Sequence, residues 1–271
     1  MAIITISRGS FSGGKTLAEC LAVRLGYRCV SRETIVDAAK RYDIPEQKLV
    51  DALTKKPGFL ERLTRERSHY MLCLRAALVR EVMDEKVVYH GNAGHLLLKG
   101  APHLIRVRVI ASLDFRIGSL MNSQQMSRKD AVDYIEKVDS ERSKWTKFLY
   151  QADWNDPALY DLVVNIDQIG ITEACEVVSG VATLDQFKST EASQKALRDL
   201  DLATEVRALL ACNAVKNGVA DAGIEIDAAD GVVTISGTVS SSEDADKTQQ
   251  VITAVPGVKQ VNSQIEVWPH W

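Results

Sequence analysis

The feature that most constrains this chain is an eight-residue segment near its N-terminus. Residues 9–16 match the complete phosphate-loop pattern G-x-x-x-x-G-K-[ST], with Gly9, Ser10, Phe11, Ser12, Gly13, Gly14, Lys15 and Thr16. An apolar run at 2–6 precedes the loop, and a helical stretch at 17–25 follows it. This strand–loop–helix context is the one a phosphate-binding loop requires. It outweighs the alternative, a glycine-rich turn with a surface lysine.

The residue types in this loop predict its chemistry. Glycines let the backbone fold around an anion, so that peptide N–H groups of the loop and of the helix start point at phosphate oxygens. Lys15 would reach the β- and γ-phosphates, and the Thr16 hydroxyl would bind Mg²⁺. The sequence therefore predicts that the chain binds a nucleoside triphosphate or descends from a chain that did.

Composition narrows the class of protein. The 271 residues are 46% hydrophobic and 25% charged, as in ordinary globular proteins, and suffice for two domains. A net charge of −3 disfavours a nucleic-acid partner. We expect no signal peptide, and no apolar run approaches the ~20 residues of a membrane span. The five cysteines are scattered, mostly among apolar neighbours, so we expect buried, reduced thiols in a cytoplasmic protein.

Residues 1–184 alternate between apolar strand-like segments and helical stretches. We expect strands near 2–6, 28–30, 87–90, 104–110 and 161–166, and helices between them that include 32–42, 59–83, 128–150 and 172–182. Apolar strands separated by helices are typical of a parallel sheet covered on both faces. This part of the chain is therefore predicted to be an α/β domain, a P-loop NTPase sheet with helices on both faces.

The chain changes character after this domain. We place a polar, aperiodic linker at 185–196 and a second domain at 197–271. The second domain is expected to contain helices at 197–213 and 241–254 and strands at 224–226, 232–239 and 258–267. Asp230-Gly231 joins two of these strands as a short turn, which favours a hairpin. We expect a small α+β domain with an antiparallel sheet.

Several segments of the first domain together resemble the cytidylate kinase-like family. They are residues 3–8 with the phosphate loop, 31–35, 107–116, 138–142 and 153–162. The resemblance covers about residues 1–182 and implies a nucleoside monophosphate kinase fold, with ATP as the phosphoryl donor and a lid of arginines over the transferring group. Lys15, Arg116 and Arg142 are then the expected catalytic residues.

The two arginines have another interpretation, since helices rich in charged residues always carry solvated arginines. Arg116 and Arg142 both fall on predicted helices. Asp139 lies three residues before Arg142, a spacing that permits an ion pair on one helix face and would orient the guanidinium.

The acceptor site is expected at two places. Arg32 and Glu33 open the helix after the second strand, where an acceptor nucleotide lies in this fold, although the helix dipole alone also favours an acidic residue there. In the family, the strand matching 87–90 is typically followed by Gly-Arg, and that arginine is expected to bind the acceptor's phosphate. This chain has Gly91-Asn92, so that cation is missing. The acceptor could therefore be CMP, with another arginine as substitute, or a different small molecule.

Two histidines flank that loop. His90 and His95 lie at the carboxyl end of a predicted strand, where ligands bind in open α/β sheets. With no third ligand at a suitable spacing, we interpret them as structural histidines rather than a metal site.

The C-terminal domain resembles the BON domain. The matching segments are residues 228–239 and 255–265. That family is associated with binding phospholipid or other ligands, so the resemblance implies a phospholipid or protein ligand for this domain.

Two functions from different classes remain. The first is an ATP-dependent kinase of the nucleoside monophosphate kinase type with a C-terminal binding or regulatory module. The second is a non-catalytic ATP-binding sensor whose nucleotide state controls what the C-terminal domain binds. A GTPase switch is disfavoured, because the sequence has neither N-K-x-D nor D-x-x-G after a strand.

Overall fold

The N-terminal part of the chain is built on a parallel sheet. A computed structural model describes residues 1–54, 66–217 and 223–268. Within these residues, five strands pair in the order β2-β3-β1-β4-β5, every neighbouring pair parallel. They are β1 (Ile3–Arg8), β2 (Arg28–Ser31), β3 (Val87–His90), β4 (Leu104–Ile110) and β5 (Leu162–Asn165). The predicted α/β fold is confirmed.

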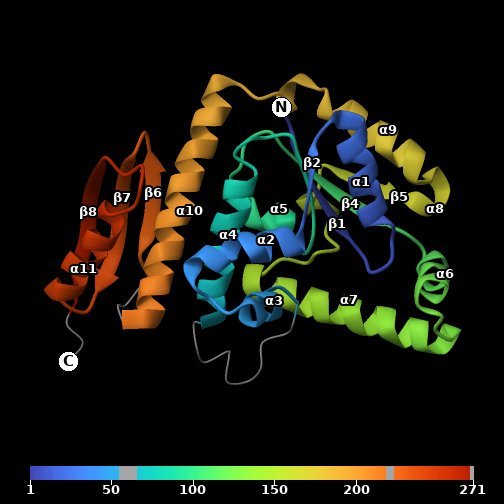
Figure 1. Cartoon of the computed structure of the whole chain (residues 1–271), viewed down its shortest axis with the longest axis horizontal. Helices are drawn as coiled ribbons and strands as arrows, with labels where there is room; N and C mark the ends of the chain where they lie inside the picture. The colour runs from blue at the N-terminus through green and yellow to red at the C-terminus, as the bar shows by residue number, and fades with distance from the viewer. Residues whose placement is uncertain (55–65, 218–222, 269–271) are drawn as a thin grey trace.

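Helices cover both faces of this sheet (Figure 1). On one face, α1 (Gly14–Leu25) packs beside α9 (Ile171–Ala182). The other face is covered by α2 (Arg32–Ala39), α3 (Glu46–Thr54), α4 (Glu66–Glu81) and α5 (Gly94–Leu97). Successive residues of β1 point to opposite faces of the sheet. Ile4 and Ile6 are buried on the face covered by α1 and α9, whereas Ile3 is buried on the face covered by α2 to α5. The sheet is apolar on both sides, as a parallel sheet requires.

Two further helices lie at the carboxyl ends of the strands. They are α6 (Leu113–Gln124) and α7 (Arg128–Tyr150), which pack together through Ile117, Leu120, Ala131 and Ile135. Ser127 begins α7, and its side chain accepts a hydrogen bond from the N–H of Asp130, as the sequence predicts. A 3₁₀ turn (Pro157–Leu159) and α8 (Ile166–Ile169) flank β5.

Some predicted helix bounds shift. The helix expected at 32–42 ends at Ala39 and continues as a 3₁₀ turn over Lys40–Tyr42. The start of the helix expected at 59–83 falls outside the described residues, and α4 itself ends at Glu81. No helix in the described ranges is both long and apolar enough to cross a bilayer.

The C-terminal part forms a separate small sheet. Its elements are α10 (Glu191–Asn217), β6 (Glu225–Ala229), β7 (Val232–Val239), α11 (Ser242–Thr253) and β8 (Gln260–Val267). The predicted hairpin is present, since β6 and β7 are antiparallel. However, β7 and β8 are parallel, so the expectation of an antiparallel sheet is wrong for the third strand. The reason is that α11 crosses over between them, and a helical crossover returns the chain in the same direction.

α10 lies between the two sheets (Figure 1). It begins at Glu191 rather than near 197, so the second half of the predicted linker is helical, and a 3₁₀ turn occupies Asp185–Phe187. Leu197 and Ala208 of α10 are buried in the core around α4. Val206 and Leu210 are buried against the second sheet. One helix therefore contributes to both cores, and the domain limits at 184 and 197 stay a prediction.

Candidate functional site

The phosphate loop connects β1 to α1 at the carboxyl edge of the sheet. Gly13 lies just before α1 in the left-handed region, with φ of 71°. Near the start of α1, the N–H of Leu17 donates a hydrogen bond to the Gly13 carbonyl at 3.0 Å. The N–H groups at the start of a helix have no acceptor within the helix. In α1 these groups include those of residues 14–16. They form the ready-made anion site expected from the sequence.

Packing holds this loop in place. Ser12 is fully buried, and its Oγ donates to the Gly9 carbonyl at 2.9 Å. A Cβ atom on Gly14 would lie 2.5 Å from Cδ of Arg8, and one on Gly13 would lie 2.6 Å from Cδ1 of Ile166. Close contacts therefore favour glycine at both positions, and at Gly13 the backbone conformation favours it as well.

Lys15 and Thr16 are both exposed at the start of α1. The Lys15 ammonium lies 3.7 Å from the Glu19 carboxylate, a solvent-exposed contact that a phosphate can displace. Thr16 offers a hydroxyl for Mg²⁺, and the described residues contain no cluster of three His, Cys, Asp or Glu side chains able to hold a metal. Mg²⁺ is usually held by one or two protein ligands together with phosphates and water, and its binding at Thr16 stays a prediction.

Arg116 lies beside the phosphate loop. Its Nε donates to the Ser10 carbonyl at 2.7 Å, and its Nη2 pairs with the Asp139 carboxylate. The other carboxylate oxygen of Asp139 accepts from the Ser10 N–H at 3.2 Å and from its hydroxyl at 3.0 Å. The expected pair between Asp139 and Arg142 is therefore not formed, because Asp139 connects α7 to the loop and to α6. A role for Arg116 at the transferring group stays a prediction.

Arg142 and Arg8 are two neighbouring cations next to the loop. Nη1 of Arg142 donates to the Arg8 carbonyl at 3.3 Å. Burial, together with the charge of Arg8, lowers the pKa of Arg142 to about 10. Burial also lowers the pKa of Arg8, whose Nη1 lies 3.1 Å from Nδ1 of His90. Neither guanidinium belongs to any ion pair found in the described part of the chain.

The start of α2 adds a third arginine. Ser31 caps the helix by accepting from the Thr34 N–H, and Arg32 and Glu33 follow. Although burial of Glu33 acts to raise its pKa, hydrogen bonds from its own N–H, Ser31 and Arg32 lower it to about 2. Nη2 of Arg32 lies 2.7 Å from the Glu33 carboxylate, and its charge also affects Arg8 and Arg142. The structure thus brings three arginines together.

The loop after β3 borders the same region. A small cavity is lined by Ser7, Arg8, Gly91, Asn92, His95 and Arg142, among others. A Cβ on Gly91 would lie 2.2 Å from the Tyr89 hydroxyl oxygen, which explains the glycine. Nδ2 of Asn92 donates to the Leu53 carbonyl at 3.1 Å, at the end of α3. Asn92 therefore bonds to the backbone of α3 at the position where the resemblance implies an acceptor-binding arginine.

The two histidines remain neutral. Burial, followed by the charge of Arg8, lowers the pKa of His90 to about 4, so its ring accepts from the Arg8 guanidinium. Burial also lowers the pKa of His95 to about 4, but neither ring nitrogen of His95 has a hydrogen-bond partner in the structure. The structural interpretation thus fits His90, whereas the unpaired polar ring of His95 lies at the cavity beside Arg142.

Sequence reasoning missed two cations in this region. Arg8 ends β1, and Arg108 lies in β4, where it is 6% exposed. The Arg108 guanidinium lies 4.0 Å from the ring centroid of Trp154 and donates to Ser7 Oγ and Asn155 Oδ1. The available signal was the alternation of Arg106 and Arg108 with apolar residues in β4, which places both arginines on the same face of the strand.

The sheet order, the phosphate loop and the surrounding arginines define a P-loop protein of the kinase type. The model of the cytidylate kinase-like family matches residues 3–168, more than half of the chain, and the chain belongs to this family. The BON domain model matches residues 198–269. None of the curated proteins matches the chain.

The first part of the chain is similar to solved structures. The crystal structure of an uncharacterized protein from Eubacterium ventriosum ATCC 27560 has a TM-score of 0.53 and 20% identity, covering 67% of this chain and 98% of that chain. Shikimate kinase from Bacteroides thetaiotaomicron aligns with a TM-score of 0.43 and 15% identity over 68% of this chain and 99% of that chain. At such low identity, the first likeness shows the fold alone.

Proposed function

We propose that this protein transfers a phosphoryl group from ATP to a nucleoside monophosphate or a related small anionic acceptor. Its kinase-like family supports phosphoryl transfer as the general chemistry. The observation that carries the proposal is the group of Arg8, Arg32 and Arg142 beside the phosphate loop. Arg8 and Arg142 are half-buried, and neither makes an ion pair with a carboxylate within the described residues, whereas charges withdrawn from water are normally paired. An anionic ligand would supply the missing countercharge.

The donor half of the site uses the loop. The N–H groups at the start of α1 and the exposed Lys15 ammonium would hold the phosphates of ATP, and the Thr16 hydroxyl would hold Mg²⁺. When bound, Mg²⁺ would supply charge neutralisation at the transferring group. Phosphoryl transfer depends on alignment of the reactants and neutralisation of charge more than on a covalent intermediate with the protein. The proposal therefore assigns no side chain of the protein as a nucleophile.

The acceptor half uses the arginines. Arg142 and Arg8 would hold an anionic group of the acceptor or of the transferring phosphoryl group. Arg32 would leave its partly exposed contact with Glu33 to join them. Each charge-assisted hydrogen bond contributes about 1.5–3 kcal/mol, so two of them amount to a large part of a micromolar affinity.

A coupled ADP-release assay against a panel of nucleoside monophosphates tests the proposal. The unmodified protein should release ADP with one or more acceptors, and Lys15→Ala should abolish this activity while the chain stays folded. Lys129→Ala is the matched control, because Lys129 is an exposed lysine outside the site. Unchanged ATP affinity and turnover in a folded Lys15→Ala protein would falsify the proposal.

One observation favours a second function, a non-catalytic ATP-binding sensor. The side chain of Asn92 is held by Leu53, so the family's acceptor-binding cation has no counterpart there. In this case Mg·ATP should bind through Lys15 without ADP release for any acceptor. ATP should then change which phospholipid or protein ligand the C-terminal domain binds. Calorimetry of Mg·ATP binding beside the turnover assay separates the two functions.

The C-terminal domain completes the proposal as a binding or regulatory unit. Its match to the BON model supports a phospholipid or protein ligand. Because the proposed reaction consumes ATP, we place the protein in the cytoplasm.

A further inference from the structure

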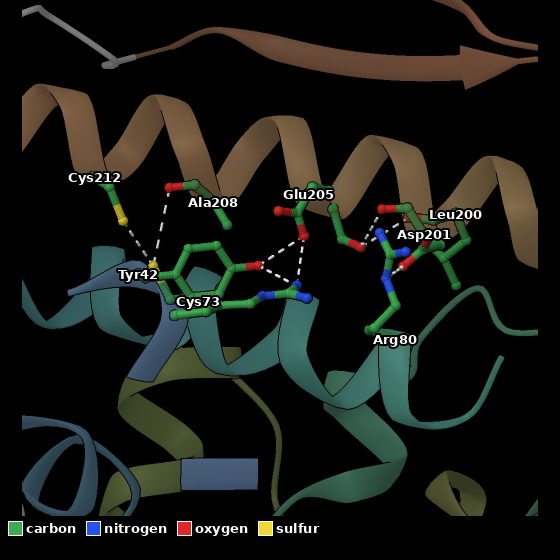
Figure 2. Close-up of polar contacts among 10 residues, drawn as sticks. Tyr42, Cys73, Arg80, Leu200, Asp201, Glu205, Ala208 and Cys212 are labelled. Atoms are coloured by element: carbon green, nitrogen blue, oxygen red, sulfur yellow. Dashed lines mark hydrogen bonds and ion pairs between the residues drawn. The ribbon is translucent and has the colours of Figure 1, made fainter. Parts of the chain in front are cut away.

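The contact between α4 and α10 joins the segment matched by the kinase-like family to the segment matched by the BON model. One face of α10 carries four residues at successive spacings of four, three and four. They are Asp201, Glu205, Ala208 and Cys212. Figure 2 shows this face directed at α4 and at Tyr42. Asp201 pairs with Arg80 at 2.9 Å, so polar contacts fix the two helices in register.

A second contact of this face involves the segment after α2. The Glu205 carboxylate accepts from the Tyr42 hydroxyl at 2.8 Å and from Nη2 of Arg41 at 2.6 Å (Figure 2). Arg41 and Tyr42 belong to the 3₁₀ turn that follows α2, and α2 begins with Arg32. α10 is therefore connected to an element of the proposed acceptor site.

Two thiols meet at the other end of the same face. Sγ of Cys73 on α4 lies 3.2 Å from Sγ of Cys212 on α10 (Figure 2). Cys73 is fully buried, whereas Cys212 is half-buried. A disulfide has an S–S length of about 2.0 Å, so the sulfurs need to approach by only about 1 Å. They lie 139 residues apart in sequence, and only the packing of α10 on α4 brings them together.

We propose that Cys73 and Cys212 form a disulfide site, oxidised by a peroxide, that covalently joins α10 to α4. Hydrogen peroxide converts the Cys212 thiol to a sulfenic acid and releases one water. The Cys73 sulfur then attacks the sulfenic sulfur, forms the S–S bond and releases a second water. Two thiols are oxidised and one peroxide is reduced to two waters, so atoms and electrons balance.

The environments of the two thiols assign these roles. Cys212 is the more accessible sulfur, and oxidation follows exposure. The hydrogen bond to Cys212 and burial raise the pKa of Cys73, so the buried sulfur stays protonated and shielded at rest. Its position against the sulfenic sulfur favours the second step by proximity. In a reducing compartment such a bond is transient and acts as a redox sensor.

Other cysteines supply internal controls. Cys29 is exposed and has no cysteine neighbour in the interactions described, so it serves as an accessible reference thiol, although partial burial raises its pKa. Burial and a hydrogen bond with Cys20 raise the pKa of Cys175 to about 11, which makes these two a second pair between α1 and α9. The expectation that most of the cysteines are buried holds fully for Cys73 and Cys175 only, since Cys20 and Cys212 are half-buried and Cys29 is exposed.

The test uses the full chain, treated with hydrogen peroxide and digested without reduction. Mass spectrometry should find the Cys73 and Cys212 peptides linked with the loss of two hydrogens, and dithiothreitol should reverse the link. The link should persist in Cys20→Ser/Cys175→Ser and disappear in Cys212→Ser. Recovery of Cys73 and Cys212 as separately alkylated peptides after Cys29 is fully oxidised overturns the proposal. This measurement on the unmodified chain does not depend on the folding of any variant.

A second readout tests whether the bond holds the contact closed. The crosslink closes a long loop, so the oxidised chain should unfold at a temperature higher by roughly 5–10 °C, and reduction should remove the increase. Cys212→Ser should show no such difference between oxidised and reduced samples. If the unmodified protein carries the link but unfolds at the same temperature when oxidised and when reduced, the bond does not stabilise this contact. Neither readout requires kinase activity, so the result is independent of the proposed function.

Discussion

Replacing Arg142 with methionine should change stability and anion binding in opposite directions. Burial lowers the pKa of this guanidinium from its ordinary 12.5 to about 10. This difference corresponds to roughly 3 kcal/mol of unfavourable free energy for the cation in the unliganded fold. Methionine retains an unbranched apolar stem but loses the hydrogen bond to the Arg8 carbonyl, which costs about 1 kcal/mol. The net expectation is stabilisation by about 1–2 kcal/mol.

This stabilisation should raise the unfolding temperature of Arg142→Met by roughly 2–8 °C. At the same time, the loss of a charge-assisted contact should weaken binding of Mg·ATP, or of a nucleoside monophosphate, by roughly 10–100-fold. Thermal unfolding without ligand and calorimetry with each nucleotide measure the two effects. Arg128→Met is the matched control on the same helix, because the Arg128–Asp114 pair is solvent-exposed and contributes little. A lower unfolding temperature with unchanged nucleotide affinity would mean that Arg142 has a structural role.

Three further results are expected. Because burial holds the pKa of His90 and of His95 at about 4, below the ordinary 6.5, the unfolded state binds more protons between these values. Urea unfolding should therefore show stability falling as the pH drops from about 6.5 to about 4, less steeply in His95→Gln. CMP should be a poor acceptor, and Asn92→Arg should improve its phosphorylation roughly ten-fold in the ADP-release assay; efficient CMP turnover by the unmodified chain contradicts this. Limited proteolysis should cut within 185–190 and release a fragment carrying all of α10, and cleavage only elsewhere would move the boundary.

The sequence predicted features whose causes are local. The phosphate loop was identifiable because its glycines, lysine and threonine are adjacent and lie between a strand and a helix. Ser127 marked the start of α7 because a cap acts within one helical turn. The alternation of apolar strands with helices indicated a parallel sheet because both of its faces must be buried.

Tertiary structure decided which of these elements meet. Asp139 was expected to pair with Arg142 on its own helix, but folding places it against Ser10 and Arg116 instead. Asn92 was expected near a substrate, and its amide is held by Leu53 of α3. Neither contact can be derived from spacing along one helix, because the partners belong to different elements.

The same limit explains α10. Its sequence predicted a helix, but not that one face would enter the core around α4 while another packs on the second sheet. Residue periodicity tells which positions share a face of a helix, and it carries no information on what that face contacts. Cys73 and Cys212 appeared as two scattered thiols in the sequence. Only the packing of α10 on α4 places their sulfurs in contact, because this proximity depends on the whole fold rather than on either helix.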